Sequence, residues 1–301
     1  MTGEFDAIDR IARLLPGPPD GETWIGDDAA VVAAPVGRLL LAADAVVAGV
    51  HADLSLTGLD DLGWKALAAN VSDIAAMGGE PGYALVTVAG PANTDLVLLY
   101  RGLQEASVAF GCPVVGGDLT NAPVLVVTVA VTGSVDGPPV LRSGARSGDE
   151  IWTTGPLGAA AHALAQLRAG TAGDTDGGAA HRRPRPRLAE GRAARILGAT
   201  AMIDVSDGFV ADLGHILDAS GVGCLLDQLP VARGATREDA LGGGEDYELV
   251  FTASPDRGVA GAFEAAGLAA PIRLGTCCAD PAERTLEGAP LIATGWQHDF
   301  S

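Results

Sequence analysis

Short apolar runs of strand length alternate along the chain with longer segments in which apolar residues recur at helical spacing. In the first half, this pattern predicts helices over residues 59–77 and 93–110 and strands over 39–44, 83–90, 112–117 and 123–135. Such alternation is typical of an α/β or α+β domain, and we expect the first domain to occupy residues 1–137.

The same rhythm resumes in what we interpret as a second α/β domain, residues 138–301, a mixed α/β sandwich. Residues 170–187 are rich in Gly, Pro and charge, and we predict a mobile insertion there. Its basic run HRRPRPR fits either a polyanion-binding patch or a solvated loop, and a solvated loop is the commoner outcome. The predicted strands are 150–155, 201–205, 223–227, 247–253 and 270–276, and the predicted helices are 158–169, 187–198, 208–220 and 255–266.

Composition and charge narrow the class of protein. Of the 301 residues, 48% are hydrophobic and 19% are charged, which is typical of a compact globular chain. The formal charge of −19 disfavours nucleic acid as a partner, because an acidic surface repels a phosphate backbone. A phosphate substrate would meet the same repulsion, so we would expect a divalent metal ion to neutralise both sides.

The N-terminus and the cysteines indicate a cytoplasmic protein without a membrane partner. The first 15 residues are acidic where a signal peptide is basic, and the longest apolar stretches are too short to span a bilayer. No CxxC pair is present, so we interpret the cysteines as thiols in a reducing compartment. They are Cys112, Cys224, Cys277 and Cys278.

Six short segments place an acidic residue where a strand or helix is predicted to begin or end, in five of them beside Gly or Ser. A single Asp next to Gly is usually a turn, so the argument rests on their number and on two unusual cases. The segments are GDDAA (26–30), AADAV (42–46), NVSDIAAMGG (70–79), VGGDLT (115–120), MIDVSDG (202–208) and GGGEDYE (242–248).

Asp73 is the first unusual case. On a helix it would share an apolar stripe with Leu62, Ala66, Ala69 and Met77. A buried carboxylate needs a partner, and no Lys or Arg stands three or four residues away. Either backbone or Ser groups bond this carboxylate, or a counter-charge such as a metal ion arrives from elsewhere.

The segment MIDVSDG is the second case. Asp204 ends an apolar strand, and Ser206 or Asp207 could simply cap the helix that starts near Gly208. Alternatively, the free N–H groups of that helix accept a phosphate, while Asp204 and Asp207 hold a metal ion on it. Ligation by oxygen alone suits Mg²⁺ or Mn²⁺ rather than Zn²⁺.

Several common catalytic motifs are absent from the sequence. It contains no GxxxxGK[ST], GxGxxG, protein-kinase set, GxSxG or HExxH. An ATP-using enzyme without them would bind nucleotide mainly through metal bridges and scattered backbone donors. Few families do so.

In order and spacing, the motifs resemble those of the thiamine-monophosphate kinases, a family of the aminoimidazole ribonucleotide synthetase superfamily. The resemblance runs from GEF (3–5) to GWQHDF (295–300) and covers nearly the whole chain. The most specific pieces are GDDAAVV, DAVVAGVH, KALAANVSDIAAMGG, VVGGD, VLRSGARSGD, IDVSDG followed by ADLGHI, and GGEDYELVF.

The resemblance implies two α/β domains with the active site in the cleft between them, and a homodimer in which the N-terminal sheets join. It implies transfer of the γ-phosphoryl group of ATP to thiamine monophosphate, giving thiamine diphosphate, with several Mg²⁺ ions per site. It also implies roles for individual residues, and Asp73, Asp118, Asp204 and Asp207 are then expected to converge on one cleft. The metal-binding carboxylates would be Asp28, Asp44, Asp73, Asp118, Asp204 and Asp207; the ATP-binding residues Gly117, Asp118, Arg142 and Ser206; and the substrate contacts His51, Glu245 and Trp296.

Some positions depart from the family pattern. Ala42 and Ala43 replace hydroxyl residues before Asp44, so one metal position is expected to be weak or empty. Ala48 replaces a Glu and Ala52 an aromatic residue around His51, which puts the exact acceptor in question.

Two alternatives remain. One is another ATP-dependent enzyme of the superfamily, although the hydrogenase-maturation enzyme would need a C-terminal Cys and selenophosphate synthetase a reactive residue near the N-terminus. The other is a non-catalytic paralogue that binds nucleotide or thiamine, against which the retention of six Asp positions argues.

Overall fold

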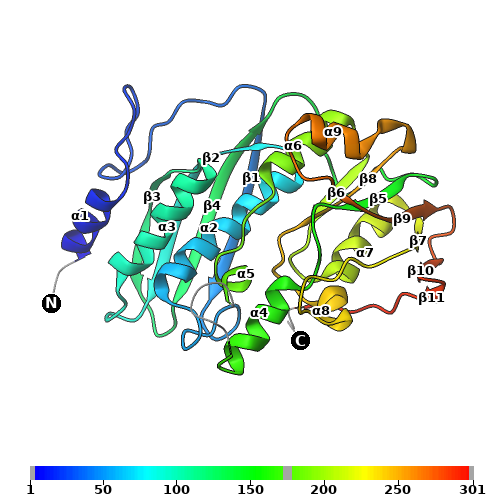
Figure 1. Ribbon diagram of the computed structural model, residues 1–301. Coiled ribbons are helices and arrows are strands. Elements are labelled where there is room, and N and C mark those ends of the chain that lie inside the picture. Colours follow the sequence, from blue (N-terminus) through cyan, green and yellow to red (C-terminus); the bar gives the residue numbers. More distant parts are fainter. Residues whose placement is uncertain (1–3, 172–177, 298–301) are drawn as a thin grey trace. The chain divides into compact units, whose positions relative to one another are not determined.

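The computed structural model describes residues 4–171 and 178–297 (Figure 1). Contacts divide the chain into two compact units, Met1–Ile74 with Glu80–Gly137, and Ala75–Gly79 with Pro138–Ser301. Residues 75–79, which the sequence places in the first domain, thus belong by their contacts to the second unit. The predicted α/β class is confirmed, because each unit contains a mixed sheet with helices packed on it.

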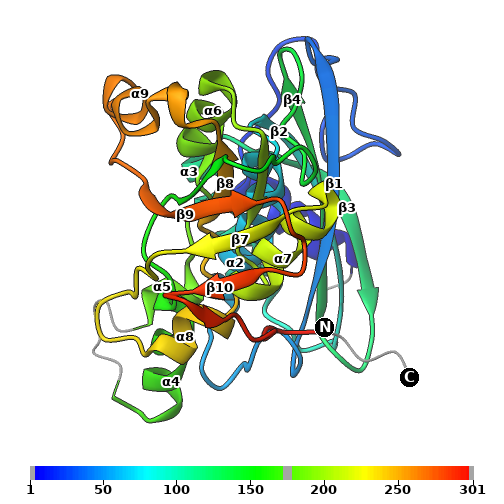
Figure 2. The same cartoon turned by 90° about the vertical axis from the view of Figure 1, so that its right-hand side faces the viewer.

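The first unit is built on a four-stranded sheet in the order β1-β4-β2-β3. Only β2 and β3 run parallel, while β4 pairs antiparallel with both β1 and β2. Helices α2 and α3 lie on one face of this sheet (Figure 2). The elements are α1 (Glu4–Leu14), β1 (Arg38–Val47), α2 (Leu59–Ala76), β2 (Glu80–Gly90), α3 (Leu96–Phe110), β3 (Val114–Asn121) and β4 (Val126–Val135).

Helices α2 and α3 approach closely through two glycines. A Cβ on Gly102 would fall 1.7 Å from the carbonyl oxygen of Asp60, and one on Gly63 would fall 2.2 Å from that of Leu99. Only glycine permits this backbone contact. The contact holds α2 close to α3 on their common face of the sheet.

The two faces of the first sheet differ in burial. Strand β4 alternates between buried and partly buried residues, and its Val127 and Val129 are fully buried. Other sheet side chains stay exposed, namely Leu39 (51%), Leu41 (72%) and Leu85 (48%). The described part of the first unit therefore presents an apolar surface on this sheet.

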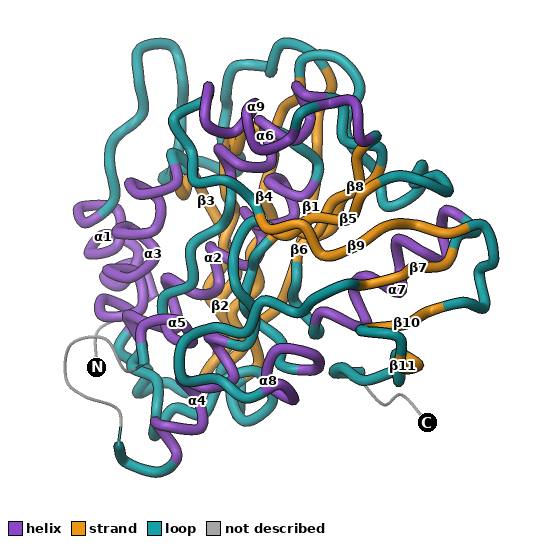
Figure 3. Tube along the Cα trace, turned by 45° about the vertical axis from the view of Figure 1, so that its right-hand side comes forward, coloured by secondary structure: helices purple, strands orange, loops and turns teal. Residues whose placement is uncertain are grey.

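The second unit is built on a seven-stranded sheet in the order β11-β10-β7-β9-β5-β8-β6 (Figure 3). All its described neighbours pair antiparallel except β10 and β7. The strands are β5 (Glu150–Thr153), β6 (Ala201–Asp204), β7 (Gly223–Leu226), β8 (Leu249–Ala253), β9 (Ile272–Cys278), β10 (Arg284–Leu286) and β11 (Ala289–Pro290). The helices are α4 (Ala159–Arg168), α5 (Ala179–Arg182), α6 (Leu188–Leu197), α7 (Phe209–Ser220), α8 (Arg237–Gly242) and α9 (Val259–Ala265), with a 3₁₀ turn at Pro255–Arg257.

At β6 and β8 both faces of this second sheet are buried, because successive residues of these strands join different cores. Ile203 and Val250 pack with α7, whereas Met202 and Phe251 pack with α6 and α9. Phe251 stacks on Phe263 of α9 with ring centroids 5.8 Å apart. Strands covered on both sides read as continuous apolar runs, which is why the sequence pattern found them.

Some elements differ from the sequence predictions. Gly258, at φ +60°, separates the 3₁₀ turn from α9, so the helix predicted over 255–266 is broken. The sequence pattern did not predict α1, α5, α8, β10 or β11, most of which are too short to show periodicity. Among the described helices, none combines the length and apolar character needed to cross a bilayer.

The predicted insertion 170–187 is only partly described, since residues 172–177 lie outside the described residues. Its remainder contains α5, in which His181 is only 4% exposed, and ends at Arg187, which bonds the buried Glu248. A solvated loop is therefore the wrong description of His181 and Arg187.

Candidate active site

The sequence-predicted site residues divide between the two units. The first unit holds Asp28, Asp44, His51, Asp73, Gly117 and Asp118, and the second holds Arg142, Asp204, Ser206, Asp207, Glu245 and Trp296. Within each unit, the structure shows which of these residues lie together.

In the second unit, the loop after β6 and the loop before β8 run side by side. The β6–β8 ladder continues past Asp204. Val205 N–H donates to the carbonyl oxygen of Glu248 (2.7 Å), and Tyr247 N–H donates to the carbonyl oxygen of Val205 (2.9 Å). Glu245 N–H then donates to the carbonyl oxygen of Ser206 (2.8 Å). Ser206, a predicted ATP contact, and Glu245, a predicted substrate contact, are 39 positions apart by their numbering. They thus touch through their backbones.

Trp296 joins the same place from the C-terminal segment. Its N–H donates to the carbonyl oxygen of Asp207 (2.9 Å), and its side chain is 55% exposed. Gly295, at φ +143°, makes this approach possible, since a Cβ there would lie 2.6 Å from that of Ala211. An exposed indole beside a carboxylate loop can stack on an aromatic ligand.

The N–H groups of the loop just before α7 are already occupied. One carboxylate oxygen of Asp212, Oδ2, accepts hydrogen bonds from the N–H groups of Ser206, Asp207 and Gly208, each at 3.0 Å. These three N–H groups are therefore not free to bind a phosphate, and the N-cap of α7 is Gly208 rather than Ser206 or Asp207. An internal carboxylate takes the place of the anion.

Asp212 is also an unusual acid. It is 2% exposed, and burial together with the charges of Asp204 and Asp207 raises its pKa to about 7, although its N–H donors act in the opposite direction. Sequence reasoning missed this residue. The available signal was an Asp beside the apolar face formed by Phe209, Leu213 and Ile216.

Asp204 and Asp207 suit a magnesium ion, which takes only some of its ligands from the protein. They suit less well a metal whose ligands are all protein side chains. In the described part of the chain, no group of three or more His, Cys, Asp or Glu side chains is arranged to hold an ion. Mg²⁺ is usually held by one or two carboxylates together with substrate phosphates and water. After burial, the charges of Asp204 and Asp207 are the next causes of the raised pKa of Asp212, and such a cation would relieve this repulsion.

Asp246, in the loop before β8, has a structural partner. Its carboxylate accepts from the N–H groups of Gly158 (2.5 Å) and Ala160 (2.9 Å) at the start of α4. Burial raises its pKa to about 6, against the effect of these N–H donors. Its flanking residues Glu245 and Tyr247 adopt positive φ values of 67° and 50°, so this loop is held in a backbone form that non-glycine residues rarely take.

Arg142 lies elsewhere in the second unit. It is exposed and follows Leu141, whose carbonyl oxygen accepts from Met202 N–H. This position is beside the middle of β6 rather than at its carboxyl end.

In the first unit, Asp44 and Gly117 lie in one row across the sheet. Asp44 of β1 pairs with Val129, Val129 with Val86, and Val86 with Gly117 of β3. Because neighbouring strands lie about 4.8 Å apart, the two edge strands are about 14 Å apart. Asp118 follows Gly117, so Asp44 and Asp118 are too far apart to share one ion.

Gly117 is a position that only glycine fits. Its φ is +155°, and a Cβ would fall 1.8 Å from the carbonyl oxygen of Val86. The next residue, Asp118, is exposed and accepts from the Thr120 hydroxyl (3.1 Å). Its charge adds to burial in raising the pKa of Tyr100.

Asn70 of α2 brings Asp44 and Asp73 into one neighbourhood. Its side-chain oxygen accepts from Asp44 N–H (2.9 Å), and its amide nitrogen donates to the carbonyl oxygen of Ala66 (2.9 Å). Asp73 follows Asn70 by three positions and so lies on the same side of the helix. Of the expected apolar stripe, Leu62 and Ala66 are fully buried, whereas Ala69, Asp73 and Met77 are only partly buried.

His51 has a fixed orientation, and Asp28 is open to solvent. Nδ1 of His51 accepts from Val47 N–H (3.0 Å), so the neutral imidazole carries its proton on Nε2. Ala52, where an aromatic residue was expected, is 4% exposed and forms a bridge with Ala48. Asp28 is exposed, and its N–H donates to Asp27 (2.8 Å).

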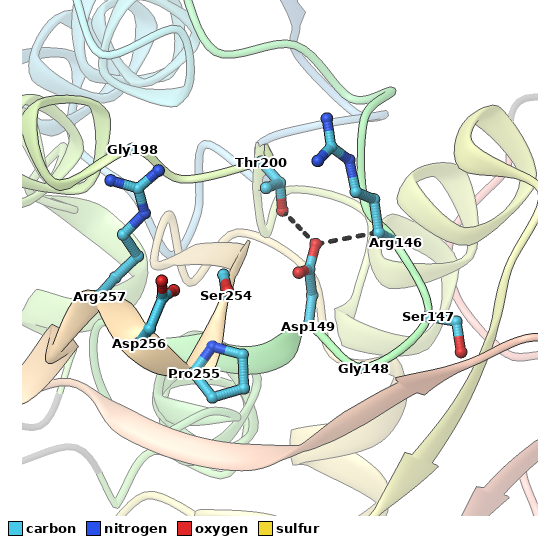
Figure 4. A pocket seen from close by; sticks show the side chains of 10 residues that line it. All are labelled: Arg146, Ser147, Gly148, Asp149, Gly198, Thr200, Ser254, Pro255, Asp256 and Arg257. Carbon is cyan, nitrogen blue, oxygen red and sulfur yellow. Dashed lines mark hydrogen bonds between the residues drawn. The ribbon is translucent and has the colours of Figure 1, made fainter.

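A separate pocket of about 460 Å³ opens at the opposite end of β5, β6 and β8 (Figure 4). In it, Asp149 accepts from Arg146 N–H (2.9 Å) and from the Thr200 hydroxyl (2.7 Å). Arg146 and Arg257 are balanced there by Asp149 and Asp256, so the lining has no excess of either charge. The length of the strands separates this pocket from Asp204–Gly208, and it is not the site that the sequence predicts.

Comparison with known proteins identifies the family. The family described as "AIR synthase related protein, N-terminal domain" matches residues 26–135, and "AIR synthase related protein, C-terminal domain" matches residues 146–284. The chain is 39% identical to a thiamine-monophosphate kinase of Mycobacterium tuberculosis over 83% of this chain and 80% of that protein.

Solved structures agree with this. A thiamine-monophosphate kinase from Stenotrophomonas maltophilia matches with a TM-score of 0.83 and 34% identity, covering 95% of this chain and 97% of that one. The structure described as AaThiL complexed with AMPPCP and TMP matches with a TM-score of 0.79 and 30% identity, covering 99% and 97%.

Proposed function

Since this chain belongs to the AIR synthase related proteins and, within them, to the thiamine-monophosphate kinases, we propose that it phosphorylates thiamine monophosphate with ATP. The γ-phosphoryl group passes from the β–γ bridging oxygen of ATP to a phosphate oxygen of thiamine monophosphate, and the products are thiamine diphosphate and ADP. The observation that carries this conclusion is the match over nearly the full chain to a relative complexed with AMPPCP, a methylene analogue of ATP, and TMP.

We propose that the carboxylates of both units hold Mg²⁺ on the phosphates of the two substrates. The candidates are Asp28, Asp44, Asp73, Asp118, Asp204 and Asp207. When bound, Mg²⁺ neutralises the charge of phosphates that must come together, which is the main requirement of phosphoryl transfer. The separation of Asp44 and Asp118 favours more than one ion.

The protein's own part is to position and orient the substrates. Asp212 occupies the N–H groups of residues 206–208, so this loop presents its carboxylates and the Ser206 hydroxyl to the ligand rather than its backbone donors. Gly117 and Asp118 are proposed to contact ATP, and Arg142 to contribute a planar guanidinium that bonds phosphate oxygens.

The acceptor is proposed to contact His51, Glu245 and Trp296. Trp296 supplies an exposed ring for stacking on a heterocycle, and Glu245 supplies a negative charge for the cationic thiazolium ring. Ala48 and Ala52 make the His51 loop smaller than the family pattern expects, without removing the imidazole.

We propose that the chain works as a homodimer joined through the sheet of the first unit. The exposed side chains of Leu39, Leu41 and Leu85 form an apolar surface of the kind that marks interfaces.

We also propose a cytoplasmic location, where ATP is available and thiols stay reduced. Cys224 and Cys277 are direct cross-strand neighbours in β7 and β9 and are both free. Such a pair is expected to persist as thiols in a reducing compartment.

A coupled assay of ADP release, run with and without thiamine monophosphate, tests the proposed function. We expect release that depends on thiamine monophosphate and Mg²⁺, and no stimulation by thiamine. Release driven by the substrates of other superfamily enzymes would favour the first alternative, and binding without release would favour a non-catalytic paralogue.

A further inference from the structure

Three carboxylates lie within four residues of the loop before β8, and each has a different partner. Asp246 bonds the start of α4, Glu248 bonds Arg187, and Glu245 lies beside His181. Like charges so close would repel one another, so this loop depends on partners from other elements. Two of the three partners come from the segment 178–187.

Arg187 fixes one end of that segment. Its Nε and Nη2 atoms donate to the two carboxylate oxygens of Glu248, at 2.9 and 2.5 Å, and Thr154 adds a hydroxyl donor at 2.6 Å. The Glu248 side chain is only 6% exposed, and both of its carboxylate oxygens are bonded inside the protein. A two-pronged Arg–carboxylate pair is the strongest kind of charged hydrogen bond.

His181 lies at the other end of the segment. Its side chain is 5% exposed, and its buried Nδ1 atom lies 3.1 Å from Oε2 of Glu245, a close contact without hydrogen-bond geometry. The Glu245 side chain is 28% exposed, so it remains accessible to a ligand where Glu248 does not.

Glu245 needs such support because of its backbone. Its φ of 67° lies in the left-handed region, which is unfavourable for a residue with a Cβ. A residue keeps this form when its surroundings fix it, and such residues gather at ligand sites. The bond from Glu245 N–H to Ser206 fixes the main chain, and His181 faces the side chain.

We propose that segment 178–187 forms one wall of the acceptor site, and that His181 is a positioning residue that orients the Glu245 carboxylate toward the cationic thiamine monophosphate. The inference rests on the proposed function, in which Glu245 contacts the acceptor. It gives the basic run HRRPRPR a role inside the site in place of a polyanion patch.

A double-mutant cycle tests the inference, with KM measured separately for thiamine monophosphate and for ATP. We expect His181→Phe to raise KM for thiamine monophosphate about tenfold, equivalent to about 1.4 kcal/mol, and to leave KM for ATP within about twofold. In a Glu245→Gln background the same substitution should have little further effect, because its target is gone. His181→Asn should restore part of the loss, since its amide nitrogen can stand where Nδ1 stands.

Arg168→Gln is the matched control, because Arg168 is an exposed basic residue of the same unit that lies outside segment 178–187. It should leave both KM values unchanged. The inference would be overturned by equal increases in the two KM values for His181→Phe, or by additive effects of His181→Phe and Glu245→Gln. Either result would leave the proposed function intact. A wild-type protein that neither binds nor phosphorylates thiamine monophosphate would overturn the proposed function as well.

Discussion

Asp207 is the residue on which the chemistry depends most directly. It follows Asp204 by three positions, and its carbonyl oxygen accepts a hydrogen bond from Trp296 N–H. The N–H groups of its loop are already bonded to Asp212. We predict that Asp207→Asn lowers kcat by about a thousandfold, because charge stabilisation of phosphoryl transfer is worth that much or more. The measurement is kcat at saturating Mg²⁺ and ATP.

Two further variants make this result specific. Asp246→Asn should lower kcat much less, because Asp246 bonds the start of α4. Asp218→Asn, at an exposed carboxylate of the same helix α7, should change little. If Asp207→Asn keeps more than about a tenth of the wild-type kcat, the assignment of the metal site is wrong.

Asp212 is a second single residue with a large expected effect, in this case on the stability of the fold. We predict that Asp212→Ala lowers the free energy of unfolding by about 3 kcal/mol or more, since it removes the shared acceptor of three backbone N–H groups. Urea unfolding monitored by circular dichroism measures this, with Asp218→Ala as the exposed control. Equal unfolding free energies for the two variants would contradict the bonded loop.

At the scale of elements, the contact between α2 and α3 is the most exacting. Ala normally stabilises a helix over Gly by about 1 kcal/mol, but at Gly102 it would press on the Asp60 carbonyl, and we predict a net loss of about 1–3 kcal/mol. Gly214→Ala is the control, because the nearest atom to its Cβ is 3.9 Å away in Arg284. It should be neutral or stabilising in the same thermal unfolding experiment.

The burial of Asp246 predicts a pH dependence of stability. The folded pKa of about 6 exceeds the ordinary value of 3.8, so the native state binds this proton more tightly than the unfolded chain does. This contribution to stability is fully present below about pH 4 and is lost as pH rises through about 6, a change of about 3 kcal/mol. Asp246→Asn cannot titrate, so urea unfolding between pH 4 and 7 should show the wild type losing this amount relative to the variant. A constant difference would contradict the raised pKa.

The sequence predicted those elements whose apolar runs are long, such as β8 and α2, since burial on both faces or along a whole helix leaves a clear pattern. It also placed Asp204 at a strand end. It could not predict that Asp212 occupies the N–H groups of that loop, or that His181 meets Glu245, because both contacts depend on how distant segments pack. The partial exposure of Asp73 was not predicted for a related reason, since the stripe is fully buried at Leu62 and Ala66 but only partly buried from Ala69 onward.

At the scale of the whole molecule, the exposed apolar sheet face predicts assembly. We expect a dimer mass in equilibrium sedimentation at micromolar concentration, and a monomer for Leu41→Asp, which places a charge on that face. Val108→Asp is the control, because Val108 is equally exposed (74%) on helix α3. A wild-type mass of one chain, or dissociation by both variants alike, would contradict this interface.

The central claim is that the chain joins a phosphoryl group from ATP directly to the phosphate of thiamine monophosphate. The most direct measurement follows ATP labelled in its γ-phosphate, incubated with thiamine monophosphate and Mg²⁺, with all phosphorylated products separated. We expect the label in the terminal phosphate of thiamine diphosphate, with one ADP formed for each molecule of product. Label released as inorganic phosphate while thiamine monophosphate stays unchanged would contradict it.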